Sequence, residues 1–76
     1  MAHQTAVQTG MKGTITALDR SNHRGLILGV DGKMHPFERE TMVLRLQFDD
    51  LSLGMAVIFD VTESGRAFNV ERPSLG

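Results

Sequence analysis

Five segments of the chain carry the alternation of hydrophobic and polar residues that is typical of short β-strands. In "MKGTITALD", for example, Met11, Gly13, Ile15 and Ala17 share one parity, and β-branched residues are frequent. The predicted strands are 11–19, 24–30, 33–38, 55–63 and 66–73. The pattern weakens over 39–54, where we expect a long loop that can include a 3₁₀ turn.

Two glycine-containing pairs mark the predicted hairpins. Asp31-Gly32 and Ser64-Gly65 each stand between two strand-like segments, and such pairs favour two-residue turns because the central positions need positive φ. Pro36 has no N–H to give to a neighbouring strand, so the third segment is expected at an edge of the sheet or with a break. Five short strands with two tight hairpins predict a small, closed or nearly closed β-barrel.

The barrel is expected to form one domain between two tails. A chain of 76 residues is the size of a single small domain. The ordered domain is therefore predicted over 11–73, after a flexible N-terminal tail at 1–10 and before a C-terminal tail at 74–76. The side chains expected inside the barrel are Ile15, Leu18, Ile27, Met34, Leu51, Val57, Phe59 and Val70.

Composition argues against several classes of site. The chain contains no cysteine, so it has neither a disulfide nor a thiolate metal ligand. Its histidines do not have the spacing of metal ligands, and no acid, base and nucleophile are grouped for catalysis. We therefore expect a protein with no enzymatic activity, no metal and no other cofactor. The absence of cysteine, of a signal peptide and of a long apolar run favours a cytoplasmic location.

The charge is nearly balanced but unevenly distributed. The net charge of −1 argues against a strongly basic clamp for nucleic acid. Five basic and three acidic residues precede Glu40, whereas three basic and six acidic residues lie from Glu40 onward, so the two parts carry about +2 and about −3. Taken alone, this distribution is typical of ordinary solvated charge.

Several short motifs together resemble a bacterial cold-shock domain. They are "MKGT" in the first strand, the Asp-Gly turn, "FDDLSLGM" before the fourth strand, and "VIFDVTESG" and "AFNV" around the last hairpin. The resemblance runs from about Met11 to about Pro73 and is clearest at the two ends. It implies a five-stranded antiparallel OB-fold barrel with a long loop between strands 3 and 4, of the kind that binds single-stranded RNA and DNA.

The resemblance also implies a binding face, from which this sequence departs. Cold-shock domains carry Lys-Gly-Phe-Gly-Phe-Ile and Val-Phe-Val-His-Phe on adjacent strands, and bases stack on these rings. The corresponding segments here read "NHRGLI" and "MHPFE". Matched position by position, the expected nucleic-acid-binding residues are three stacking rings, a guanidinium, an aliphatic contact and a phosphate contact: Phe37, His35 and Phe48, then Arg24, Leu26 and Lys12.

The sequence thus predicts non-catalytic binding of single-stranded RNA or DNA through a reduced aromatic platform. This function requires Arg24, Leu26, His35 and Phe37 to share one solvent-facing surface. Because several ring positions of the family are empty here, the affinity is expected to be weak to moderate and sensitive to salt. The alternative is a protein-interaction OB module that has lost nucleic-acid binding. It would bind a different partner or a second copy through Leu26 and Phe37, or through the strand edge near Pro36.

Overall fold

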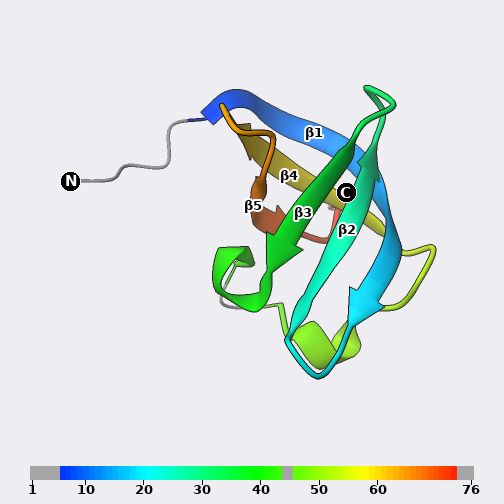
Figure 1. Ribbon diagram of the computed structural model, residues 1–76. Coiled ribbons are helices and arrows are strands. Elements are labelled where there is room, and N and C mark those ends of the chain that lie inside the picture. The colour runs from blue at the N-terminus through cyan, green and yellow to red at the C-terminus, as the bar shows by residue number, and fades with distance from the viewer. Residues whose placement is uncertain (1–5, 44–45, 74–76) are drawn as a thin grey trace.

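The computed structural model describes residues 6–43 and 46–73 (Figure 1). The elements in chain order are β1 (Ala6–Asp19), β2 (Arg24–Gly29), β3 (Met34–Glu38), η1 (Arg39–Thr41), η2 (Phe48–Asp50), β4 (Ala56–Thr62) and β5 (Ala67–Glu71), where η denotes a single 3₁₀ turn. Within this part of the chain, no helix has the length and apolar character needed to cross a membrane.

The strands form one sheet in the order β3-β2-β1-β4-β5, and every neighbouring pair is antiparallel. The prediction of an all-β fold with five antiparallel strands is confirmed. The sheet curls into a half-barrel that brings β5 behind β3 (Figure 1). Beside η1 the two edges are joined by a parallel bridge between Met42 and Val70, and Val43 N–H donates to the Val70 carbonyl at 3.0 Å. This architecture is consistent with an OB-like barrel.

The first strand begins earlier than its sequence pattern predicted. β1 extends along β4 from Ala6, with register shifts near Gln8. Gly10 has a φ of +66°, and its N–H donates to Asp60 Oδ1 at 3.0 Å. This hydrogen bond holds β1 against β4 where the regular pairing is interrupted. The predicted flexible tail at 1–10 is therefore wrong over 6–10, while 1–5 and the predicted tail at 74–76 lie outside the described residues.

Both predicted hairpins are present, but each turn is longer than the predicted two residues. Gly32 and Gly65 have φ values of +80° and +86°, and the N–H of each donates to the carbonyl oxygen three residues earlier. Among the described residues, neither Asp31 nor Ser64 has positive φ. Each turn is therefore a three-residue loop that ends in a left-handed glycine, the next most common hairpin connection after the two-residue turns.

The hydrophobic core fills the concave side of the curled sheet. Its buried members are Met11, Ile15, Ile27, Phe37, Met42, Phe48, Leu51, Val57, Phe59, Val61, Ala67 and Val70. Of the predicted interior residues, Leu18 is only partly buried against this cluster, and Met34 is exposed. The placement of Met34 in the core was wrong because Met34 pairs with Leu28, whose side chain lies on the convex side of the sheet.

Candidate binding surface on the convex side of the sheet

The register between β2 and β3 decides which side chains meet solvent. Leu26 is paired with Pro36, and Ile27 is paired with His35. Residues that are directly opposite in an antiparallel pair project from the same side of the sheet, and Ile27 is fully buried. Arg24 and Leu26 therefore lie on the convex side, whereas His35 and Phe37 point into the core. The prediction that these four residues share one solvent-facing surface is wrong.

The predicted stacking rings are enclosed by the protein. Phe37 is 1% exposed, and His35 and Phe48 are each 3% exposed. The ring centroids of Phe37 and Phe48 are 6.2 Å apart, and the His35 ring lies 5.4 Å from that of Phe59. A nucleobase can stack only on a ring face that solvent can reach, so none of these three residues offers a platform in this structure.

Glycines on β2 explain why the rings point inward. A Cβ atom on Gly25 would lie 2.9 Å from Phe37 Cε1, and one on Gly29 would lie 3.1 Å from His35 Cδ2. Both distances are shorter than ordinary van der Waals contact, so the rings occupy the space that the missing side chains leave. The alternation of Gly25, Ile27 and Gly29 was the sequence signal for this arrangement, because a buried strand face with two glycines needs large side chains from its neighbour.

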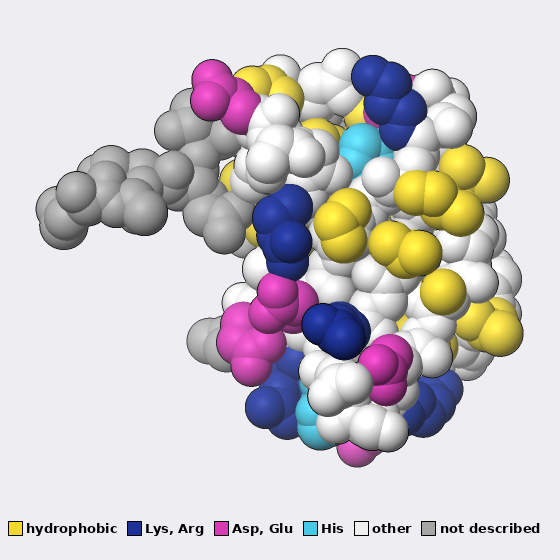
Figure 2. All heavy atoms as spheres, viewed as in Figure 1, with side chains coloured by type: hydrophobic (Ala, Val, Ile, Leu, Met, Phe, Trp, Pro, Cys, Tyr) yellow, Lys and Arg dark blue, Asp and Glu magenta, His cyan; other side chains and the backbone are white. Residues whose placement is uncertain are grey.

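Aliphatic side chains take the place of the expected platform. We call the convex surface of β1, β2 and β3 the outer face. Its apolar residues are Ala17, Leu26, Leu28, Met34 and Pro36, and Val30 follows directly after β2. Val30 is 76% exposed, Met34 51% and Leu28 40%. Thr16 Oγ1 lies 3.5 Å from Met34 Sδ, which shows that side chains of β1 and β3 meet across β2. Figure 2 shows hydrophobic side chains gathered over this part of the molecule.

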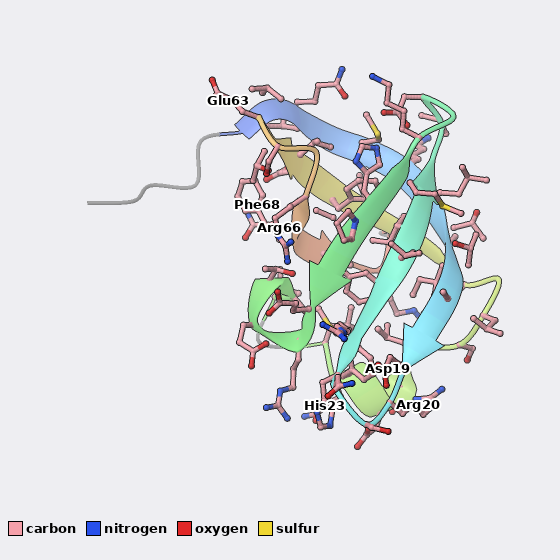
Figure 3. The ribbon with its side chains drawn as sticks, viewed as in Figure 1. Asp19, Arg20, His23, Glu63, Arg66 and Phe68 are labelled. Atoms are coloured by element: carbon pink, nitrogen blue, oxygen red, sulfur yellow. The ribbon has the colours of Figure 1, made fainter. Side chains whose placement is uncertain are left out.

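A groove of about 380 Å³ crosses one end of the outer face. The charged side chains of Asp19, Arg24, Glu38 and Arg66 line this groove. Its apolar lining consists of Ala17, Leu18, Leu26, Pro36 and the buried Phe37. Sequence reasoning did not identify Asp19 or Arg66 as part of a site. Arg66 reaches the groove from the turn between β4 and β5 (Figure 3), a contact that depends on the curl of the sheet.

The charges on the groove rim cancel in two pairs. Arg66 Nη2 lies 2.6 Å from Glu38 Oε1, and Arg24 Nε lies 3.8 Å from Asp19 Oδ2. The pKa of Asp19 is lowered, chiefly by a hydrogen bond from the Asn22 side chain and less by Arg24. Each arginine thus faces a carboxylate, and a phosphate would have to compete with that carboxylate for the guanidinium.

The remaining predicted contacts lie on the outer face or beside it. Lys12 is exposed on β1 and is paired with Ile58 of β4. Together with Arg24 and Leu26, it is one of three predicted site residues that the structure leaves on the outer face. Arg20 is engaged elsewhere, because its Nη2 donates to the Leu51 carbonyl at 2.7 Å.

The free edge of β3 is poorly suited to pairing with another strand. Pro36 has no N–H to donate. Thr41 Oγ1 accepts a hydrogen bond from Glu38 N–H at 3.0 Å and donates to the Glu38 carbonyl at 2.8 Å. Edge strands are commonly protected from aggregation by such devices. The geometry therefore argues against the predicted alternative of strand pairing near Pro36.

Neither the described residues nor the comparisons assign this surface to a known type of site. Over the described ranges, no group of histidine, aspartate and glutamate side chains is placed to hold a metal ion. A comparison of the sequence with protein-family models and with curated proteins found no match.

Proposed function

We propose that this protein is a non-catalytic protein-interaction module that binds a second copy of the chain through its outer face. The observation that best supports this proposal is the row of exposed aliphatic side chains at Leu28, Val30 and Met34. Removing such surface from water stabilises a contact by about 25 cal/mol per Å². Contiguous exposed apolar patches are typical of interaction sites.

The charges around the outer face favour a second copy as the partner. The groove end carries two arginines and two carboxylates, and the opposite end, at the β2–β3 turn, carries Asp31 and Lys33. Two copies that pack face to face in opposite directions place mixed charges against mixed charges at both ends. A two-fold contact uses the same patch on both chains, and a net charge of −1 per chain gives little repulsion between them.

Single-stranded RNA or DNA is the second candidate partner. The exposed cations Lys12, Arg24 and Lys33 and the resemblance to cold-shock OB domains favour it. Base stacking on aromatic side chains contributes about 1–3 kcal/mol per base, however. Among the described residues of the outer face and its groove, the aromatic ring is that of Phe37, which is 1% exposed and offers no stacking surface. Nucleic acid would therefore depend on phosphate contacts, with Asp19 and Glu38 beside the arginines.

Analytical ultracentrifugation of the purified protein over a wide concentration range tests the proposal. The wild type should show a reversible equilibrium between monomer and dimer. Leu28→Glu and Met34→Glu should each weaken the association by about tenfold or more, because each places a charge in a contact that excludes water. Leu53→Glu is the matched control: Leu53 is 65% exposed and lies in the loop before β4, outside the strands that form the outer face. This variant should associate like the wild type.

A parallel titration with a fluorescently labelled single-stranded oligonucleotide distinguishes the two candidates. Salt-sensitive binding that Arg24→Ala abolishes, by a protein that stays monomeric, would select nucleic acid as the partner. A monomeric wild type at every concentration, or equal weakening by Leu53→Glu, would contradict the proposed self-association.

A further inference from the structure

His35 connects the turns of the two hairpins from inside the protein. Its Nδ1 lies 2.7 Å from the carbonyl oxygen of Gly65 in the β4–β5 turn. Its Nε2 lies 3.0 Å and 3.2 Å from the two carboxylate oxygens of Asp31 in the β2–β3 turn. These two turns belong to opposite ends of the strand order, so one buried ring bridges the two edges of the curled sheet.

Both partners of the ring are hydrogen-bond acceptors. A backbone carbonyl only accepts, and an ionised carboxylate only accepts. The pKa of Asp31 is lowered, first by the N–H of Lys33, which donates to Oδ1 at 3.0 Å, and also by His35, so this carboxylate is ionised near neutral pH. A neutral imidazole has one N–H and can satisfy only one of the two acceptors, whereas an imidazolium satisfies both.

The other charged residues near the two turns are directed elsewhere. Arg66 points toward η1 and pairs with Glu38, and Glu63 points away from the molecule (Figure 3). Lys33 is exposed, and it is its backbone N–H that reaches Asp31. From β4, the ring faces the uncharged side chain of Phe59. Among the described residues, Asp31 is thus the charged group that contacts the His35 ring.

We infer that His35 is a proton-dependent clasp: with both ring nitrogens protonated it ties the β2–β3 turn to the β4–β5 turn, and loss of one proton releases the Asp31 side. The Nδ1 bond to Gly65 is the shorter of the two, whereas Asp31 is partly exposed, so water can hydrate its carboxylate once the ring no longer bonds it. This inference is independent of the proposed self-association. Its consequence is that the two sheet edges are held together most firmly while the ring carries both protons.

Two measurements on the intact chain test the clasp. In nitrogen-15 NMR spectra of the histidine rings, both nitrogens of His35 should carry protons while the ring bonds both turns, and Nδ1 alone once the Asp31 bond is lost. Urea unfolding should show the ratio of folded to unfolded protein falling as the pH is raised and the ring loses one proton, by at most about tenfold per pH unit. A ring whose Nε2 lacks a proton at the acidic end, or a wild type with no such pH dependence, would overturn the inference.

Three variants identify the responsible group. His35→Gln should remove this pH dependence. Asp31→Asn should reduce it without loss of folding, because a carboxamide can donate to a neutral ring nitrogen as well as accept from a protonated one. His23→Gln is the matched control and should keep the wild-type dependence, since His23 lies in the β1–β2 turn against Phe48. Equal pH dependence in wild type and His35→Gln would refute the clasp even if the ring spectra were ambiguous.

Discussion

Phe37 of β3 and Gly25 of β2 are directly opposite each other, and the phenyl ring fills the space above the glycine. A methyl group at this position would meet the ring on one side and the Ala17 carbonyl oxygen on the other. The ring is enclosed by the core and cannot move without disturbing Phe48. This single contact accounts for the loss of the predicted platform, because it commits the largest side chain of β3 to the interior.

Replacement of Gly25 by alanine should therefore destabilise the fold. We expect the free energy of unfolding to fall by about 1–3 kcal/mol, the usual cost of forcing extra volume into a packed interior. Urea denaturation followed by circular dichroism would measure the change. Thr14→Ala, at an exposed position of β1, should alter the free energy by no more than about 0.5 kcal/mol. A Gly25→Ala variant as stable as the wild type would show that the ring is not held against β2.

At the end of β3, the N–H and the carbonyl of Glu38, which face away from β2, are satisfied within the chain. Thr41, at the end of η1, bonds both the N–H and the carbonyl of Glu38. The Thr41 hydroxyl thus bonds two backbone groups that would otherwise be free to pair with a strand of another molecule. Together with Pro36, it keeps this edge from acting as a template, so the proposed association uses the face of the sheet and not its edge.

Thr41→Val should expose that edge while keeping the shape of the side chain. The variant should lose about 1–2 kcal/mol of stability, the contribution of one or two hydrogen bonds. It should also scatter more light than the wild type at high concentration. Thr9→Val, at an exposed position of β1, places the same apolar group on the surface and should leave the scattering unchanged. Increased scattering in both variants alike would attribute the effect to added surface hydrophobicity.

The strands and hairpins were predictable because alternation and turn glycines are local signals. Each observed strand overlaps its predicted segment, and Gly32 and Gly65 have positive φ in the two hairpin turns, as expected. The direction in which β3 faces was not predictable from its own residues. "MHPFE" alternates equally well either way, and only the need of Gly25 and Gly29 for large partners selects the side on which His35 and Phe37 lie.

The site could be predicted less well than the fold because it depends on contacts between distant segments. Arg24 and Leu26 lie on the solvent-facing side of β2, as their alternation with Ile27 indicated. That these two residues and Lys12 bind a partner stays a prediction. The pairing of Arg66 with Glu38 and the bridge from His35 to Gly65 join β3 to the last hairpin across the closing sheet. No pattern within either segment indicates such a contact.

In the molecule as a whole, two carboxylates should make stability fall in acid. The pKa values of Asp19 and Asp31 are both lowered from 3.8, chiefly by hydrogen bonds from Asn22 and from the Lys33 N–H respectively. A carboxyl group whose pKa is lower in the folded state stabilises the fold above its unfolded pKa, and this contribution disappears as the pH falls through the folded value. The unfolding midpoint in urea should therefore drop between about pH 5 and about pH 2.

Asp19→Asn and Asp31→Asn should each make this acid decline shallower. Asp19 lies before β2 and Asp31 after it, so the two groups are far apart and the double variant should show the sum of both effects. Asp49→Asn, which removes an exposed carboxylate from η2, controls for the change in net charge.

The loss of stability in acid has the opposite pH dependence to the loss expected from His35 at higher pH. Stability should thus pass through a maximum between the two declines, with the acid side governed by the two carboxylates and the other side by the clasp. A steady rise in stability toward alkaline pH would contradict the clasp and leave the carboxylate prediction standing.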